Sequence, residues 1–314
     1  MKIVITGGLG HIGSRWIHGF RAGELEEVVL LDNLATQRYS SLFNLPAGVK
    51  FRFIEDDICT AKLEKCFEGA DVVVHLAAIT NAAGSFDIQE QVERVNYLGT
   101  ERVARACAAS GSRLVFLSTT SVYGTQESVV DEYCRIDELK PQSPYAESKL
   151  RGENLLKSLG ESAGLKFIIC RFGTIFGTAI GMRFHTAINK FCWQACLGQP
   201  VTVWRTALNQ RRPYLDLGDA ERALSFILDN NLFDNEVYNV LTINATVGDI
   251  LDLIRAHVPG LRIEFVESPI MNQLSYTVAV EKFKARGFQF YGDLARGIRE
   301  TLDLIRNMGP LSGL

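Results

Sequence analysis

Tyr145 and Lys149 lie four residues apart, a spacing that puts both side chains on one face of a helix. Ser143 and Pro144 come directly before them, and these residue types suit the cap and the first turn of a helix. A lysine ammonium near a phenol stabilises the phenolate and so lowers the pKa of the tyrosine. The pair therefore indicates a tyrosine that acts as a general base near neutral pH.

Four hydroxyl residues follow the apolar run at 114–117, in the order Ser118-Thr119-Thr120-Ser121. If this run is a central strand, they lie at its carboxyl edge, where open α/β sheets bind their ligands. A tyrosine and a lysine at this spacing also occur on exposed helix faces. The hydroxyl cluster favours the catalytic interpretation of the pair.

A glycine-rich run, TGGLGHIG at residues 6–13, follows an apolar segment at 2–5 and leads into a helical pattern. Gly7 permits a tight turn, Gly10 lets the backbone approach a pyrophosphate, and Gly13 lets the helix pack close to the strand. The phosphates then lie at a helix N-terminus, where free N–H groups favour negative charge. The run predicts a dinucleotide-binding site.

Asp32 ends the next apolar run and stands 19 residues beyond Gly13. A carboxylate there accepts hydrogen bonds from a ribose and repels a 2′-phosphate, which favours NAD over NADP. The alternative for Asp32 is a solvated turn residue. Asp56 and Asp57 follow the apolar run at 51–54 and predict either a plain turn or a contact with adenine.

Apolar runs alternate with helical patterns through the first half of the chain, which is typical of a parallel sheet covered on both faces. We expect an α/β fold, a Rossmann doubly wound parallel sheet formed by residues 1–170, to which residues 211–240 return. Residues 171–210 and 241–314 are expected to form a smaller interleaved C-terminal α/β lobe that binds substrate. The predicted strands lie at 2–5, 28–31, 51–54, 72–76, 114–117 and 166–170, and the predicted long helices at 88–109 and 145–163.

Composition argues against several classes of protein. The chain has 314 residues and a net charge of −3, which gives no indication of nucleic-acid or membrane-surface binding. No secretory signal is expected, because no basic segment followed by a long apolar stretch begins the sequence, and no membrane span is expected, because no apolar run approaches about 18 residues. The seven cysteines are scattered without a CxxC pair, which predicts reduced thiols in a cytoplasmic protein and no metal site.

With these features in place, the chain resembles the NAD-dependent nucleotide-sugar epimerases and dehydratases of the extended short-chain dehydrogenase/reductase family. The resemblance spans nearly the whole chain and rests on several segments in the expected order. These are TGGLGHIG at 6–13, Asp57-Ile58, HLAA at 75–78, Asn96, SVYG at 121–124, SPYAESK at 143–149, Arg212-Pro213-Tyr214 and Tyr238-Asn239-Val240.

The resemblance implies that Tyr145 is the catalytic base, that Lys149 orients a ribose and tunes Tyr145, and that Thr119 hydrogen-bonds the reacting hydroxyl. It also implies NAD as cofactor, a nucleotide-diphosphate sugar as substrate, and a homodimer formed through two helices of each subunit. The implied cofactor contacts are Gly7, Gly10, His11, Ile12, Gly13, Asp32, Asn33, Asp57, Ile58, Leu76, Ala77, Ala78, Asn96, Ser118, Tyr145, Lys149 and Phe172. The implied substrate contacts are Thr80, Thr119, Thr120, Thr174, Arg183, Arg212 and Tyr276.

The chain departs from the family's usual pattern at three places. Thr174 stands where the family usually has asparagine, and Pro213 stands where it usually has aspartate. The segment 267–276, where a second phosphate-binding arginine is expected, contains none. Arg183 and Arg205 are the candidates to replace it.

Thr120 and Ser121 favour one reaction over others. Similar dehydratases carry an acidic pair before VYG, and similar decarboxylases carry glutamate there, whereas this chain has no carboxylate at either position. Reversible hydride transfer at C4 remains, which predicts a 4-epimerase. The alternatives are a 4-dehydrogenase or ketoreductase, less favoured a 4,6-dehydratase, and, outside enzymes, an NAD-sensing protein, a class that typically lacks the tyrosine–lysine pair.

Overall fold

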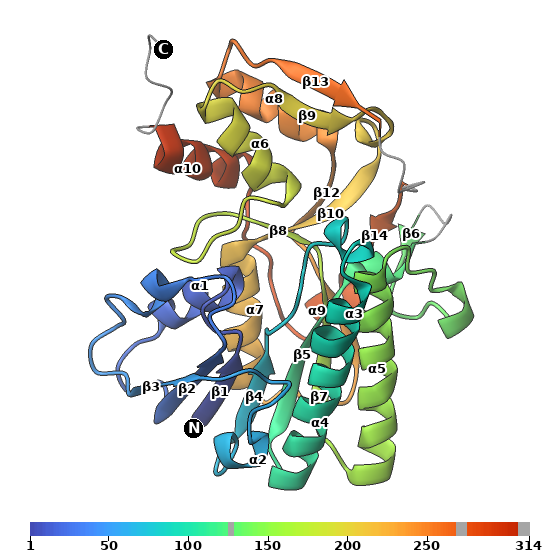
Figure 1. The fold of residues 1–314 in the computed structure, drawn as a ribbon. Helices are drawn as coiled ribbons and strands as arrows, with labels where there is room; N and C mark the ends of the chain where they lie inside the picture. The colour runs from blue at the N-terminus through green and yellow to red at the C-terminus, as the bar shows by residue number, and fades with distance from the viewer. Residues whose placement is uncertain (125–128, 268–274, 307–314) are drawn as a thin grey trace.

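The computed structural model describes residues 1–124, 129–267 and 275–306. Its centre is a seven-stranded sheet in the order β11-β7-β5-β4-β1-β2-β3, and every neighbouring pair is parallel (Figure 1). This confirms the predicted Rossmann doubly wound sheet. The strands are β1 (Lys2–Thr6), β2 (Glu27–Asp32), β3 (Phe51–Glu55), β4 (Val72–His75), β5 (Arg113–Thr119), β7 (Phe167–Phe172) and β11 (Val237–Val240).

Both faces of the sheet are buried because its strands are apolar at consecutive positions. In β1, Ile3 and Ile5 pack on one side with α1 and α7, while Val4 packs on the other side with α2, α4 and α5. Figure 1 shows these helices flanking the sheet. Their bounds are α1 (His11–Gly19), α2 (Leu63–Cys66), α4 (Gly99–Ser110), α5 (Pro144–Ala163) and α7 (Leu217–Asp229).

The stretch predicted as one helix at 88–109 is helical but not uniform. It consists of α3 (Gln89–Val92), a π-helical segment η3 (Glu93–Leu98) and then α4. The predicted helical stretch is confirmed, and its π-helical part was not visible in the sequence because π turns keep a nearly helical pattern. Within η3, buried Asn96 accepts from the Ile79 N–H at 2.8 Å and donates to the Ile79 carbonyl at 2.9 Å.

A smaller layer lies at the carboxyl ends of the central strands (Figure 1). It has its own apolar core, formed by α6, α8, α10 and the strands beside them. In the segment 211–240, α7 and β11 pack with the central sheet, whereas β10 pairs with β8 and β12 in the smaller layer. The domain boundaries themselves stay a prediction. The strands are β8 (Thr174–Phe176), β9 (Val201–Trp204), β10 (Arg211–Asp216), β12 (Ile243–Thr246) and β13 (Ile263–Val266), and the helices α6 (Ala187–Cys196), α8 (Val247–His257) and α10 (Leu294–Arg306).

Shorter elements complete the described chain. Strands β6 (Val129–Val130) and β14 (Thr277–Val278) pair with each other, and α9 (Glu281–Lys284) packs against β11. The remaining short turns are η1 (Tyr39–Leu42), η2 (Gly84–Phe86), η4 (Thr120–Val122), η5 (Ile136–Glu138) and η6 (Arg205–Ala207). Within the described ranges, no helix combines the length and apolar character needed to cross a membrane.

Candidate active site

The glycine run forms the turn between β1 and α1. Gly7 has φ +68°, and a Cβ at this position would lie 2.5 Å from the Ala77 nitrogen. A Cβ on Gly13 would lie 2.3 Å from the carbonyl oxygen of Gly8. Gly10 caps α1 and makes no side-chain capping bond, so the helix N-terminus is left for a ligand.

Acidic and amide side chains gather beside this turn. Asp32 accepts hydrogen bonds from the backbone N–H groups of Leu9 at 3.1 Å and Leu34 at 3.0 Å. Asn33, predicted from the same segment, donates to Asp57 at 3.1 Å. The structure therefore brings the second and third strand ends together, as contact with one adenosine requires. Asp32 also holds its own loop, and its contact with a ribose stays a prediction.

The predicted catalytic residues come from two elements. Thr119 is the last residue of β5, and Tyr145 and Lys149 lie in the first turns of α5. The Ser143 side chain accepts from the Ala146 N–H at 3.2 Å and Pro144 begins the helix, which confirms the predicted cap. This cap fixes where α5 begins and hence where Tyr145 lies.

The pKa of Tyr145 is set by opposing effects. Burial raises it, while the Arg183 charge and a hydrogen bond with Thr119 lower it. Lys149 is 3% exposed and its Nζ lies 4.9 Å from the centre of the Phe116 ring. Burial lowers the pKa of Lys149 to about 8, against the attraction of Glu153.

Glu153 and Arg171 are functional candidates that the sequence interpretation missed. Arg171 donates twice to Glu153, at 2.9 and 2.7 Å, and both side chains are almost fully buried. The Ser118 hydroxyl, predicted to contact cofactor, donates to the same carboxylate at 2.5 Å. The sequence could have pointed to Glu153 through its spacing, because it follows Lys149 by four residues and so lies one helical turn away on the same face of α5.

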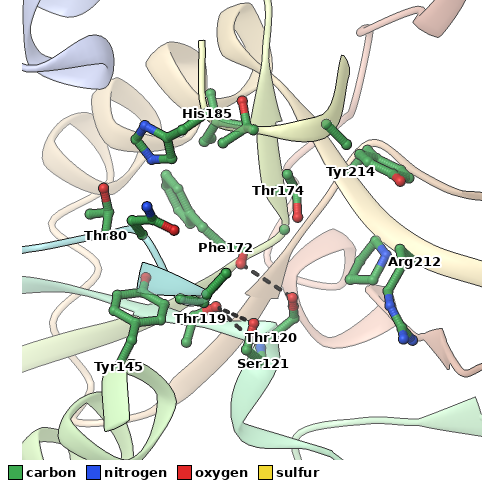
Figure 2. Close-up of a pocket in the computed structure, with 18 of the residues that line it drawn as sticks. Thr80, Thr119, Thr120, Ser121, Tyr145, Phe172, Thr174, His185, Arg212 and Tyr214 are labelled. Carbon is green, nitrogen blue, oxygen red and sulfur yellow. Dashed lines mark hydrogen bonds between the residues drawn. The ribbon is translucent and has the colours of Figure 1, made fainter. Parts of the chain in front are cut away.

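A cavity of about 410 Å³ opens above these residues, between the central sheet and the smaller layer. Figure 2 shows Thr119 and Tyr145 on one side of it and Arg212 on the opposite side. The cavity brings together all seven predicted substrate contacts and several predicted cofactor contacts. Those that line it are Ile12, Leu76, Ala78, Thr80, Ser118, Thr119, Thr120, Tyr145, Lys149, Phe172, Thr174, Arg183, Arg212 and Tyr276.

Tyr276 and the two arginines have defined positions in the wall. The Tyr276 hydroxyl donates to the Thr120 carbonyl at 3.2 Å, and the Arg212 guanidinium lies 5.3 Å from the Tyr276 ring centre. Arg183 donates to the Thr80 hydroxyl. Arg205 is exposed and pairs with Glu267 outside the cavity, so of the two candidates Arg183 lines the site. Residues 268–274 of the segment expected to carry an arginine lie outside the described residues.

Not every predicted side chain faces a ligand. The His11 Nε2 is 2.9 Å from the Gly177 carbonyl, and burial lowers the pKa of His11 to about 3, so the ring is neutral. Asn96 is bonded to Ile79, and Ile58 packs against Gly99. In the structure the side chains of these residues contact other parts of the chain, and their contact with the cofactor stays a prediction.

Comparison with known proteins now decides the family. A family model described as the NAD dependent epimerase/dehydratase family matches residues 3–240. The chain belongs to this family.

The relatives within the NAD-dependent epimerase/dehydratase family act on several nucleotide sugars. An uncharacterised UDP-glucose epimerase of Bacillus subtilis is 30% identical over 76% of this chain and 76% of its own length. A trifunctional UDP-glucose 4,6-dehydratase, epimerase and reductase of Arabidopsis thaliana is 29% identical over 96% of this chain, which spans only 46% of that protein. The UDP-glucuronic acid 4-epimerase of Bacillus cereus, solved with UDP-glucuronic acid and NAD, is 26% identical with a TM-score of 0.85, covering 98% of this chain and 100% of the other.

As an NAD-dependent epimerase/dehydratase, the chain has a turn that fits its cofactor. Any side chain at Gly7 or Gly13 meets backbone within 2.6 Å, so the glycines keep this turn compact and open to a pyrophosphate. Asp32, Asn33 and Asp57 lie together beside this turn, and their contact with adenosine stays a prediction. Across the described residues, no group of histidine, cysteine and acidic side chains is arranged to hold a metal ion.

A methyl group at Gly13 tests this turn. We expect Gly13→Ala to lower the free energy of unfolding by about 1–3 kcal/mol, because α1 must shift away from Gly8. The same shift is expected to weaken NAD binding, measured by isothermal titration calorimetry. Gly260→Ala is the matched control, since a Cβ there has no neighbour within 4 Å. Equal effects of both changes would contradict the packing argument.

Proposed function

We propose that this protein is an NAD-dependent nucleotide-sugar 4-epimerase. One observation carries the proposal: Thr119, Tyr145 and Lys149 meet at one end of a cavity whose described lining contains no aspartate or glutamate. A hydroxyl group can lose and regain its proton there, while elimination lacks the additional acid and base that it requires. The similarity to an uncharacterised UDP-glucose epimerase and to a UDP-glucuronic acid 4-epimerase supports this choice.

In this mechanism, Tyr145 as phenolate accepts the proton of the sugar C4 hydroxyl. Thr119 holds that hydroxyl through its own Oγ, and the ammonium of Lys149 stabilises the phenolate. The chemistry that NAD supplies when bound is reversible hydride exchange at C4. The protonated Tyr145 returns its proton to the C4 oxygen when the sugar is reduced on its opposite face. All side chains then regain their starting protonation states.

The experiment uses the purified protein without added NAD. It is incubated with UDP-, dTDP-, GDP- and CDP-sugars, and the products are identified by proton NMR. A C4 epimer without external cofactor is the expected result. Products that form only with stoichiometric NAD or NADH would replace the proposal with a dehydrogenase or ketoreductase.

The charge of Lys149 predicts a pH dependence. Because burial lowers its pKa to about 8, the ammonium loses its proton as pH rises through this value, and support for the phenolate is lost. We expect kcat to fall above about pH 8. Lys149→Arg keeps its charge at these pH values, so its alkaline limb should move to higher pH. If the alkaline limb of the kcat–pH profile is the same in Lys149→Arg as in wild type, another group is responsible for the titration.

The proposal includes a homodimer formed through the outer faces of η3, α4 and α5. Its support in this chain is an exposed strip on these elements, in which Leu98 is 45% exposed. In the same strip Arg151 forms an ion pair with Glu93, and its guanidinium lies 3.7 Å from the Tyr97 ring centre. Light scattering of the wild type and of Leu98→Asp tests it, with a monomer expected for the variant. A cytoplasmic location stays a prediction.

A further inference from the structure

The cavity is lined by several positively charged side chains. They come from four elements or loops, no carboxylate is among the described lining residues, and Glu153 acts on Lys149 from outside the lining. Burial and the nearby Arg183 and Arg38 lower the pKa of His185 to about 4, so this histidine adds no charge near neutral pH. The cations are Lys149, Arg183, Lys190 and Arg212.

These cations lie at different ends of the cavity. Figure 2 places Arg212 across the cavity from Tyr145 and Thr80. Arg183 donates to Thr80 and acts electrostatically on Tyr145, so its charge lies at the end where the sugar reacts. With C4 of a nucleotide sugar at Tyr145, Arg212 at the opposite side of the cavity is the side chain available to the diphosphate.

Arg183 has no carboxylate partner among the described residues, and its charge acts on Tyr145. Its Nε is buried and has no hydrogen-bond partner among the described residues, and its other contact is the neutral Thr80 hydroxyl. A buried guanidinium with an unused donor is unfavourable unless a ligand satisfies it. A carboxylate matches the guanidinium in shape and charge and accepts two of its N–H bonds.

The cofactor pyrophosphate is the competing source of negative charge. However, another arginine already stands at the glycine turn, because the Arg38 Nη1 would lie 3.7 Å from a Cβ on Gly10. Arg38 does not line the cavity, whereas Arg183 lines it together with Tyr145 and Thr119. Because Arg38 lies at the glycine turn and Arg183 lies in the cavity, Arg183 is better placed to bind the sugar than the cofactor pyrophosphate.

We propose that the sugar bears a carboxylate, so that the substrate is a nucleoside diphosphate hexuronic acid whose carboxylate binds Arg183. The hydroxyls of Thr80, Ser121 and Thr174 line the same cavity and complete a polar pocket for this group. The inference rests on the proposed function and names its substrate class.

Calorimetric binding to the NAD-loaded protein is the test, with UDP-glucuronic acid and UDP-glucose as probes. We expect wild type to bind the acid at least about tenfold more tightly. Arg183→Gln is expected to weaken acid binding by about ten- to a hundredfold, as loss of a charged hydrogen bond does, with a much smaller change for UDP-glucose. Arg183→Lys, which keeps the charge but not the planar fork, should fall between them. Arg299→Gln, at an exposed position of α10, should change neither affinity.

Two binding results would overturn the inference: equal affinities of the wild type for both sugars, or a loss in Arg183→Gln that is the same for both. A variant that binds NAD more weakly but the acid normally would assign Arg183 to the cofactor. Proton NMR of products separates this inference from the proposed function. Epimerisation of UDP-glucose but not of UDP-glucuronic acid overturns the acidic substrate alone. Selective acid binding without any C4 epimer supports the carboxylate pocket and overturns the epimerase.

Discussion

Tyr145→Phe is expected to lower kcat by about 10²–10⁴-fold, the range that a positioned general acid–base group contributes. The change removes one hydroxyl group and keeps the ring that lines the cavity. Its backbone N–H still faces the Ser85 hydroxyl at 3.4 Å, and the Ser143 cap of α5 is untouched. The fold and NAD binding should therefore stay close to wild type, so the loss can be assigned to proton transfer.

Tyr133→Phe is the matched control for this prediction. Tyr133 is 75% exposed and lies outside the cavity, so its hydroxyl has no part in the reaction and kcat should not change. Steady-state kinetics on both variants and thermal unfolding curves complete the measurement. Near-normal turnover by Tyr145→Phe would remove Tyr145 as the base. It would also reopen the NAD-sensing alternative, for which the tyrosine–lysine pair is not needed.

The features that sequence predicted well are local. The position of Tyr145 relative to Lys149 follows from helical periodicity, and the start of α5 follows from Ser143 and Pro144. The turn between β1 and α1 was predictable from its glycine spacing, and at Gly7 and Gly13 the structure leaves no room for a Cβ. Helical periodicity and capping preferences were sufficient here, because the start of a helix and the spacing along it depend on only a few neighbouring residues.

The features that sequence did not predict depend on contacts between distant segments. Arg183 was a candidate from the sequence, but it belongs to the loop before α6 and only the folded chain places it beside Thr80 and Tyr145. The pairing of β9 with β13 joins Val201 to Ile263, and no periodicity in either segment reveals its partner. Charged residues such as Glu153 and Arg171 are ordinarily expected on the surface, so their burial could not be read from residue type.

The buried pair of Glu153 and Arg171 links stability to catalysis. Glu153 lies between three groups: it accepts from Arg171 and Ser118, and its charge raises the pKa of Lys149. Arg171 also lies 4.9 Å from the centre of the Tyr123 ring. Replacement of Arg171 alone leaves the Glu153 carboxylate buried without its ion-pair partner. Replacement of both residues by apolar ones leaves neither charge of the pair buried. The two changes therefore have different consequences for folding and for activity.

We expect Arg171→Met to lower the free energy of unfolding by about 3–5 kcal/mol, because it leaves Glu153 buried without its partner. Glu153→Leu combined with Arg171→Met should recover much of this loss in urea denaturation, since no buried carboxylate remains at the pair. Activity should not recover with it, because Lys149 then lacks the charge that favours its ammonium. The fall of kcat at alkaline pH should begin at a lower pH in the double variant than in wild type. A loss below about 1 kcal/mol for Arg171→Met, a value typical of exposed pairs, would show that water reaches the pair. Recovery of both stability and kcat in the double variant would show that Glu153 serves packing alone and does not position Lys149.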